Sequence, residues 1–511
     1  MSVHGLPTEK MSPVEEVMLI FLYGYLPSPP VSTTPSLCCA AAAADKADRV
    51  SRLPDNLLRR VVSLLPAKDG ARTTVLSSRW RGIWRSAPTV LVDTHLLPSG
   101  HGERRPARAC AASRTATAAV SAALESHPGP FPFVSLTCSF MMDGGTHSGL
   151  LARWFQLLAT KGVDELVFVN RSWPPSRGLP LPSSLFSCAS LCRLFIGAWV
   201  FPDTAALPRR AAFPNLRHLV LACVAIKDYD LEFVLAASPV LEILTVTGSL
   251  TPLRARLTSH SLRCVQLCLS TLEEVAVVDA PSLERLFIYK NWNERHGLSN
   301  VKTTVKIGHA PKLRVLGYLE PGVHLLQISN TIIQAGTKAS MHTTVPSVQM
   351  LAVQLQFAFC SEVEMLPSFL RCFPSVETLV VESRAHRETL INLNFKIWQQ
   401  ASPIECVQSH LKTLAFHELQ GKHNEFAFLK FIAENARRLE RMFILIKNEL
   451  SYTERQVVAA GVGSLYCANW ASRDCNVQYK ISSLPVGCST WSLPRGSDLF
   501  LDDPFEAFRE E

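Results

Sequence analysis

A short phrase of apolar and polar positions recurs along the middle of the chain. It opens with a small residue or proline and places apolar residues at its third, sixth and eighth positions. Eight copies lie between about Val163 and Phe416: ASLCRLFI from Ala189, PNLRHLVL from Pro214, PVLEILTV from Pro239, PSLERLFI from Pro281, PKLRVLGY from Pro311, PSVQMLAV from Pro346, PSVETLVV from Pro374 and SHLKTLAF from Ser409. Alternation with a period of two is typical of a strand. Each copy therefore predicts one short strand.

The spacing of the copies indicates a repeat architecture. The first aliphatic residues are 25, 25, 21 and 21 residues apart at Leu191, Leu216, Leu241, Leu262 (in the weaker copy SHSLRCVQL) and Leu283. These periods are typical of leucine-rich repeats, which stack one strand per repeat into a parallel sheet. A single buried sheet would also give apolar strands, but it would not repeat one phrase eight times. Later spacings of 28 to 35 residues predict an irregular solenoid. Charged residues inside the phrase should point outward: Arg217, Glu242, Glu284, Arg314 and Glu377.

Helical spacing precedes the repeats. In LPDNLLRRVVSLLP, one helix face collects Leu57, Leu58, Val61, Val62 and Leu65, with Pro54 in the first turn and Pro66 at the end. A second short helix is expected from Asp69, as its N-cap, to about Leu76. A third should follow the cap Ser77, carry Trp80, Ile83 and Trp84, and end at Pro88. Three helices in about forty residues cannot bury all of their apolar surface, so this module predicts a partner.

The C-terminal part returns to helical spacing. In HNEFAFLKFIAENARRLERMFILI, Asn424 is the expected cap, and one face carries Phe428, Phe431, Ile432 and Leu439. A strand is expected from Met442 to Ile446. Such a βαβ-like unit would close the open end of the solenoid.

Composition supports a folded protein of more than one domain. The chain has 511 residues, 47% of them hydrophobic and 18% charged. Its net charge of +8 is local, because nine Lys or Arg and three Asp lie between Asp48 and Arg85. The stretch RTTVLSSRWRGIWRS, from Arg72 to Ser86, could therefore bind nucleic acid, fill a core or hold another protein.

The cysteines and the N-terminal sequence indicate the cellular compartment in which the protein is expected. The fifteen cysteines form no CxxC pair, which predicts reduced, mostly buried thiols; His260, Cys264 and Cys268 are expected in the core and not around a metal. The apolar run from Val17 to Leu26 is about half the length of a membrane span and follows two glutamates, unlike a secretory signal. We expect a location in the nucleus or the cytoplasm, with no membrane partner.

Three segments carry a family resemblance. DRVSRLPDNLLRRVVSLLPAKDGARTTVLSSRWRGIW, from Asp48 to Trp84, resembles a plant F-box in its Leu-Pro opening, its LL-pair helix and its RT-x-VLS-x-RWR-x-(I/L)W ending. The repeats resemble the divergent leucine-rich repeats that follow plant F-boxes. SPIECVQSHLKTLAFHELQGKHNEFAFLKFIAENARRLERMFIL, from Ser402, is similar to the FBD segment at the end of the same proteins.

The resemblance implies an α/β fold: a three-helix F-box, then an irregular leucine-rich-repeat solenoid of parallel strands and helices, capped by a βαβ-like FBD region. We expect a disordered extension at 1–45, the F-box at 46–92, the repeats at 93–400, the FBD-like region at 401–475 and a tail at 476–511.

The function implied by the resemblance is that of a non-catalytic substrate-recognition subunit of a Skp-cullin-F-box ubiquitin ligase, with no cofactor. The F-box would bind a Skp adaptor and through it a cullin, and the repeats would bind a target protein. The implied adaptor-binding residues are Leu53, Pro54, Leu57, Leu58, Val61, Leu65, Val75, Leu76, Arg79, Trp80 and Trp84. Gly70 departs from the family, which usually has a larger aliphatic residue nearby, and could cost about 1 kcal/mol of helix stability and some adaptor affinity.

Other classes fit less of the chain. A nucleic-acid-binding protein would explain the arginines, but the chain has no zinc finger, RNP-like strand or basic tail. A repeat scaffold outside any ligase keeps the same modules. A secreted repeat protein would need several glycosylation sequons, and only Asn170-Arg171-Ser172 fits one. An enzyme is not suggested by any GxSxG, P-loop, HExxH or GxGxxG motif.

Overall fold

The computed structural model describes residues 2–3, 6–7, 22–23, 25–31, 50–97, 106–138, 141, 146–171, 179–208, 211–249, 251–289, 302–384, 397–398, 403–448, 450–482 and 492–505. They divide into two compact units, Met1–Thr251 and Pro252–Glu511. Among the described residues, none of the helices combines the length and the hydrophobicity that crossing a membrane requires.

Unit 1 begins with the predicted short helices. These are α2 (Asp55–Ser63), α3 (Ala67–Arg72), the 3-10 turn η2 (Thr73–Val75) and α4 (Ser78–Ser86). Ser77 is the N-cap residue of α4, as expected, and α4 ends before Pro88. The prediction for the second helix was wrong at its start, because Pro66 occupies the N-cap position and Asp69 lies inside the first turn. Proline suits this position since its missing N–H would have no helical partner.

The rest of unit 1 is a parallel sheet with one strand per repeat. In sheet order the strands are β3 (Leu91–Val92), β4 (Phe133–Leu136), β5 (Glu165–Val169), β6 (Arg193–Gly197), β7 (His218–Ala222) and β8 (Ile243–Thr247). The connections contain α5 (Asp93–Leu96), α6 (Pro106–Ser126), α7 (Thr146–Thr160), η4 (Ser183–Ser187), η5 (Thr204–Ala206) and α8 (Asp228–Ala237). Near the N-terminus, β1 (Ser2–Val3) pairs antiparallel with β2 (Leu6–Pro7).

Unit 2 contains a second run of parallel strands. In sheet order these are β10 (Cys264–Cys268), β12 (Arg285–Tyr289), β14 (Val315–Leu319), β17 (Met350–Leu355), β18 (Thr378–Ser383), β19 (Thr413–Leu419), β20 (Arg441–Ile446) and β21 (Asn476–Ile481). Its helices are α9 (Cys360–Arg371), α10 (Glu405–Ser409), α11 (His423–Asn435), α12 (Tyr452–Tyr466) and α13 (Leu493–Ser497).

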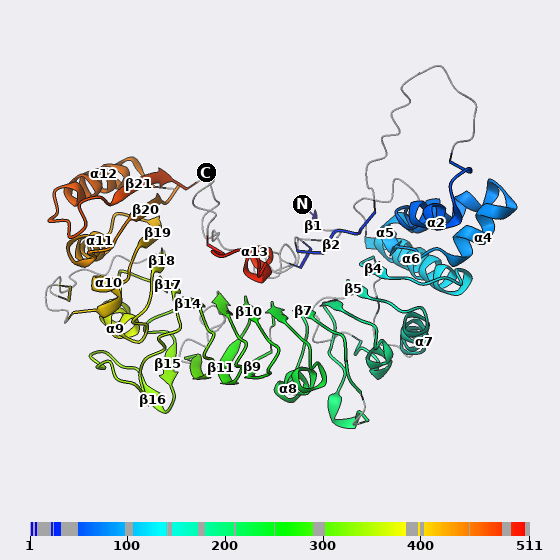
Figure 1. Cartoon of the computed structure of the whole chain (residues 1–511), viewed down its shortest axis with the longest axis horizontal. Helices are drawn as coiled ribbons and strands as arrows, with labels where there is room; N and C mark the ends of the chain where they lie inside the picture. Colours follow the sequence, from blue (N-terminus) through cyan, green and yellow to red (C-terminus); the bar gives the residue numbers. More distant parts are fainter. Residues whose placement is uncertain are drawn as a thin grey trace, which may run out of the picture. The chain divides into compact units, whose positions relative to one another are not determined.

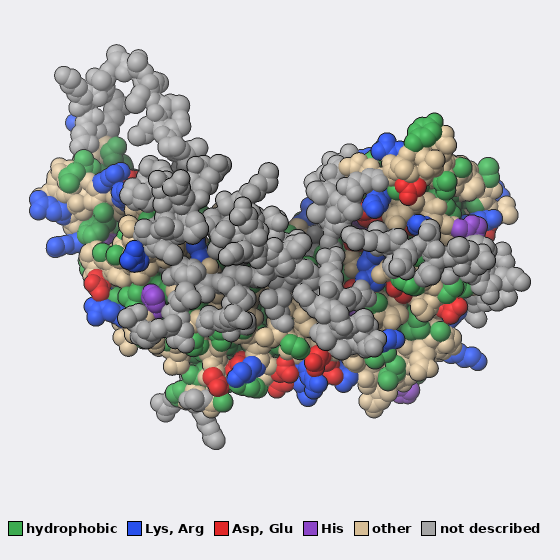
Figure 2. All heavy atoms as spheres, turned by 180° about the vertical axis from the view of Figure 1, so that it is seen from behind, with side chains coloured by type: hydrophobic (Ala, Val, Ile, Leu, Met, Phe, Trp, Pro, Cys, Tyr) green, Lys and Arg blue, Asp and Glu red, His purple; other side chains and the backbone are tan. Residues whose placement is uncertain are grey.

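A separate sheet in unit 2 was not predicted. It consists of β9 (Leu253–Thr258), β11 (Leu272–Asp279), β13 (Thr304–His309), β15 (Leu325–Ile328) and β16 (Thr331–Ile332), parallel except for the β15–β16 pair. These strands alternate with β10, β12 and β14 along the chain. They lie in the connections between repeat strands, where other repeats have helices (Figure 1). Figure 2 shows acidic and basic side chains close together over this part of the surface. Neighbouring strands of the sheet are joined by the ion pairs Arg254–Glu273 and Lys306–Glu274.

Every copy of the recurrent phrase forms a strand, which confirms the repeat prediction. The copies correspond to β6, β7, β8, β12, β14, β17, β18 and β19, and the weaker copy to β10. The first aliphatic residues are fully buried, including Leu191, Leu216 and Leu283. The charged residues before the strands pair with the neighbouring repeat, as in Arg263–Glu284 at 2.7 Å and Lys412–Glu377 at 2.8 Å. Exposed pairs of this kind contribute little stability, so the aliphatic layer supports the stack.

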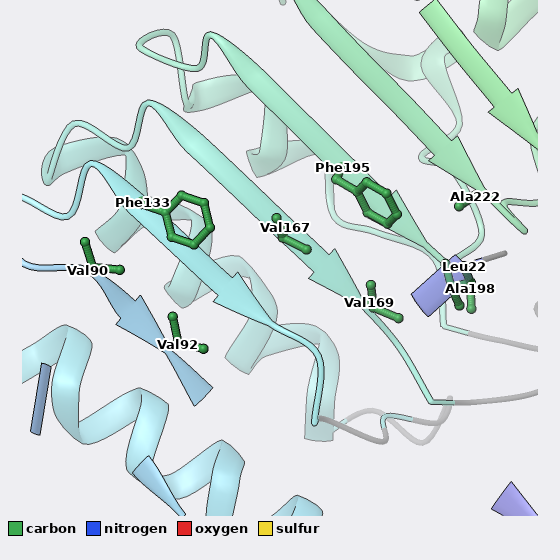
Figure 3. Packing of buried hydrophobic residues seen from close by; sticks show 9 residues of the cluster. All are labelled: Leu22, Val90, Val92, Phe133, Val167, Val169, Phe195, Ala198 and Ala222. Atoms are coloured by element: carbon green, nitrogen blue, oxygen red, sulfur yellow. The ribbon is translucent and has the colours of Figure 1, made fainter. Parts of the chain in front are cut away.

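Part of the N-terminal extension belongs to the fold. Leu22, from the apolar run, is buried in a cluster with Val169, Phe195 and Ala198 on the face of β5 and β6 (Figure 3). Gly197 makes this contact possible, because a Cβ there would lie 2.6 Å from Leu22 Cδ1. Disorder was expected throughout 1–45, and at Leu22 this expectation fails because the side chain finds an apolar surface. Most of the extension lies outside the described residues.

The prediction for the C-terminal region was correct for the strand and wrong for the N-cap of the helix. The expected strand is β20, and Phe428, Phe431 and Ile432 of α11 are buried. Leu439 is buried too, but it follows the helix. Asn424 lies inside α11 and its Nδ2 donates to the Phe357 carbonyl at 2.9 Å. The helix instead begins after Lys422, whose backbone N–H donates to the Glu425 carboxylate at 2.7 Å. β21 then extends the sheet beyond β20 into the expected tail.

Candidate protein-docking site

The three N-terminal helices sort their apolar residues into an inner and an outer set. The inner set is a core of Leu58, Val62, Trp80, Ile83 and Ala87, against which Leu53 and Trp84 pack. Leu58 is 0% exposed, and Trp80 is also buried. Both were expected either to contact the adaptor or to pack inside the module, and the structure places both inside. Leu58 and Val62 are four residues apart and therefore share the inward face of α2.

The outer set is exposed although it is apolar. Along α2 it forms an outer row, Leu57, Val61 and Leu64, at the spacing of one helix face; these side chains are exposed by 47%, 39% and 46%. A second group, Val75 and Leu76, is exposed by 84% and 63% at and after η2. Clustered apolar side chains on a small module mark an interaction site. Leu64 was missed from the sequence, although its distance of seven residues from Leu57 is a detectable signal.

The Leu-Pro opening is held in place by Arg79. Its Nε and Nη2 donate to Asp55 Oδ1 at 2.9 and 2.7 Å, and Nη2 also donates to the Leu53 carbonyl at 2.7 Å. Arg79 Nη1 donates to the carbonyl of Ser51. The prediction gave Arg79 a place on the adaptor surface, but these bonds make it the tie between α4 and the entry to α2. Pro54 is exposed at this entry, while Leu53 and Leu65 are half-buried.

Trp84 connects the helical module to the first repeat. Its ring lies 4.9 Å from that of His127, which follows α6, and His127 Nε2 lies 3.1 Å from the Ala87 carbonyl oxygen. Burial lowers the pKa of His127, so the imidazole is favoured in its neutral form. The two tryptophans therefore have different positions. Trp80 fills the module, and Trp84 packs at its junction with the sheet.

Exposed basic side chains lie on the same helices as the outer set. Exposed residues of α2, α3 and α4 include Arg59, Arg60, Lys68, Arg81 and Arg85. Figure 2 shows Lys and Arg side chains next to hydrophobic ones on this end of the molecule. An apolar patch on a basic module fits an acidic partner surface, because apolar anchors give affinity and the charges accelerate encounter.

Gly70 does not distort its helix. A Cβ at Gly70 would lie 3.6 Å from Val62 Cγ1 and 3.9 Å from Trp84 Cδ1, which are ordinary contact distances. The expected weakness at this position is thus one of backbone entropy, and not of an unfilled hole in the core.

In the described parts of the chain, no group of three or more His, Cys, Asp or Glu side chains could hold a metal ion. Cys264 and Cys268 are buried, and burial raises the pKa of the Cys264 thiol to about 12. His260 was expected in the core but is exposed. Asn170 of the sequon is buried, and its Oδ1 accepts from the Met141 N–H at 2.9 Å.

Comparison with known proteins identifies all three regions. An F-box domain model matches residues 50–89, the leucine-rich-repeat model named for the FBD-associated F-box protein At5g56370 matches 151–381, and an FBD model matches 399–444. The F-box/LRR-repeat protein At3g26922 of Arabidopsis thaliana is 31% identical over 47% of this chain and 67% of its own length. The chain belongs to the F-box/LRR-repeat family.

Similarity to the family extends along most of this F-box/LRR protein. F-box/LRR-repeat protein 13 of Arabidopsis thaliana is 25% identical over 80% of this chain and 92% of its own length. The FBD-associated F-box protein At5g60610 of the same plant is 25% identical over 77% of this chain and 98% of its own length. The F-box match covers α2 to α4, and the FBD match covers α10, β19, α11 and the start of β20. An F-box followed by repeats supports, in general terms, a substrate-adaptor role.

Proposed function

We propose that this protein is the substrate-recognition subunit of a Skp-cullin-F-box ubiquitin ligase. The F-box binds a Skp adaptor and through it a cullin, the repeats bind the target protein, and other subunits transfer ubiquitin. We place this activity in the nucleus or the cytoplasm. The observation that carries the proposal is the exposed outer set, Leu57, Val61, Leu64, Val75 and Leu76, on a module whose core is complete without it.

The outer set can supply the affinity that docking needs. Fully burying a Leu or Val side chain contributes about 1.5 to 3 kcal/mol, and these five side chains are between 39% and 84% exposed. Taken together they can contribute roughly 4 to 8 kcal/mol before the cost of association. The exposed arginines of α2 and α4 raise the association rate with an acidic partner and make it sensitive to salt.

Co-purification with Skp adaptors tests the proposal. The chain should form a stable complex with at least one adaptor, and the double variant Leu57→Ala with Leu76→Ala should lose it while staying folded. Val457→Ala is a matched control, because Val457 is a similarly exposed apolar residue on α12. Leu53→Ala is a poorer test since Leu53 packs against the F-box core.

Failure of the wild-type chain to bind any of a broad set of adaptors would overturn the ligase assignment. Equal binding by the wild type and the double variant would show that the outer set is not the docking surface. Loss of binding by the double variant supports the proposal only if its melting temperature matches that of the wild type.

A further inference from the structure

A segment near the C-terminus lies on the sheet of unit 2. We call residues 492–505 the C-terminal strap; it includes α13 and passes over β10, β12 and β14. Figure 1 shows α13 beside β10, on the face opposite the second sheet formed by β9, β11 and β13. Leu493 and Phe505, near the two ends of the strap, are both buried.

Arg285 on β12 is the centre of this contact. It is 1% exposed, and its Nη1 donates to the carbonyls of Gly496 and Asp498 at 3.2 and 2.8 Å, while its Nη2 donates to the Leu501 carbonyl. A buried guanidinium is costly unless hydrogen bonds replace its water. The strap supplies these bonds through backbone oxygens, from the last turn of α13 at Gly496, from its C-cap residue Asp498 and from Leu501.

Polar side chains beside Arg285 also contact backbone carbonyls of the strap. On β10, Gln266 Nε2 donates to the Leu493 carbonyl at 3.1 Å, and Cys264 Sγ lies 3.3 Å from the Gly496 carbonyl. From β14, Arg314 Nη2 donates to the Asp502 carbonyl at 3.3 Å. The face thus carries several side-chain donors directed at the backbone carbonyls of one peptide segment.

An aromatic site lies at the end of the strap. The ring of Phe505 is 5.9 Å from that of Phe287 and 5.8 Å from that of Tyr318, in edge-to-face geometry. A Cβ at Gly317 would lie at an ordinary contact distance of 3.5 Å from Phe505 Cζ, but only 2.7 Å from the Ala352 Cβ on the next strand. Such a site accepts one aromatic side chain of a bound peptide.

The strap leaves part of this face unsatisfied. Among the buried atoms of the described residues that have no hydrogen-bond partner, two belong to this face: Gln266 Oε1 is an acceptor, and Arg285 Nε is a donor. A carboxylate at the position of the strap carbonyls could accept two parallel bonds from the guanidinium, which is the stronger arrangement. An N–H of a bound peptide would satisfy the glutamine oxygen.

We propose that this face binds a segment of a target protein that carries an acidic residue near an aromatic one, and that the C-terminal strap is its internal competitor. This inference rests on the proposed function, since it names the surface by which the repeats select a target. The strap has a matching composition: Asp498, Asp502 and Asp503 precede Phe505, and the backbone carbonyls of Asp498 and Asp502 accept from Arg285 and Arg314.

The test uses the full chain with a protease site inserted between Ser482 and Ser492, so that the strap is cut only after folding. The probe is a fluorescein-labelled peptide with the sequence of residues 492–511, followed by fluorescence anisotropy. The cut protein should bind the probe at least about tenfold more tightly than the uncut protein, because the internal competitor can then dissociate.

Variants test the chemistry of the face. Arg285→Gln should weaken probe binding at least about tenfold, whereas Arg263→Gln, on the exposed Arg263–Glu284 pair, should change it less than about twofold. In the probe, Phe505→Ala should weaken binding, and Phe500→Ala should not, because Phe500 is 98% exposed. A probe with Asp498→Asn, Asp502→Asn and Asp503→Asn should bind less tightly.

Three results would overturn the inference. The cut protein could fail to bind the probe although its melting temperature is unchanged, Arg285→Gln could bind as well as Arg263→Gln, or cutting could unfold unit 2, which would make the strap part of the core. None of these changes touches the F-box, so adaptor binding is measured in the same samples. Its loss would count against the proposed function alone.

Discussion

Leu57 and Leu58 are adjacent in sequence, but on α2 Leu57 faces solvent and Leu58 faces the core, so replacing each with alanine separates docking from folding. Leu57 is 47% exposed, and docking can bury about half of a leucine side chain, worth roughly 0.7 to 1.4 kcal/mol. Leu57→Ala should therefore weaken adaptor binding about three- to tenfold. Leu58 is 0% exposed, and Leu58→Ala should instead destabilise the F-box by about 2 to 5 kcal/mol.

Two assays distinguish these outcomes. Titration calorimetry with a Skp adaptor gives the affinity, and amide hydrogen exchange over α2 and α4 gives the local stability of the F-box, which global melting of a chain with two units would blur. Leu58→Ala should accelerate exchange by at least about 30-fold, the equivalent of 2 kcal/mol. Leu57→Ala should leave exchange unchanged. The reasoning is refuted if Leu57→Ala accelerates exchange as much as Leu58→Ala, or if it stays folded and binds with wild-type affinity.

Three further predictions concern stability. Leu22→Ala should destabilise unit 1 by about 2 kcal/mol, seen as faster exchange in β5 and β6; no change would mean that the N-terminal contact is not made in solution. Gly70→Ala should stabilise the F-box by about 0.5 to 1 kcal/mol, which slower amide exchange in α3 would show. Destabilisation would contradict the conclusion that a Cβ fits at Gly70. Burial raises the pKa of Glu425 from its ordinary 4.5 to about 7, so the folded state binds more protons in that window and stability falls as pH rises through it. Urea unfolding of Glu425→Gln between pH 4.5 and 7 should lack this slope, and an identical slope in both proteins would contradict the assignment.

The repeat strands could be predicted because each depends on a local pattern. Alternation within eight residues specifies the strand, and the spacing of Leu191, Leu216 and Leu241 specifies the stacking. The second sheet of unit 2 escaped prediction, although the burial of β9 alternates residue by residue. Its strands do not carry the recurrent phrase. The segment that connects one repeat strand to the next can be a helix, a 3-10 turn or a strand, and each of these can present the same apolar side chains to the core. The choice depends on how neighbouring repeats pack.

The candidate site was predictable as a segment but not residue by residue. Helical spacing places Leu57, Leu58 and Leu65 on one broad face, and it cannot say which half of that face meets α4. The same limit applied to the tryptophans. Trp80 is buried because α4 crosses α2 at that point, whereas Trp84 meets His127 from the first repeat, a residue 43 positions later in the chain. Packing between elements decides each case.

Arg285 shows the limit of local patterns most clearly. It follows Glu284 in PSLERLFI, and both residues look like solvent-facing charges in the middle of a strand phrase. The structure separates them: Glu284 pairs with Arg263 at the surface, while Arg285 is buried beneath carbonyls that lie more than 200 residues later in the sequence. A charge that is buried only because a distant segment covers it is exposed again when that segment leaves. Because a buried guanidinium is costly without hydrogen-bond acceptors, whichever segment covers this face must supply them to Arg285. The strap and a target segment therefore compete for the same guanidinium.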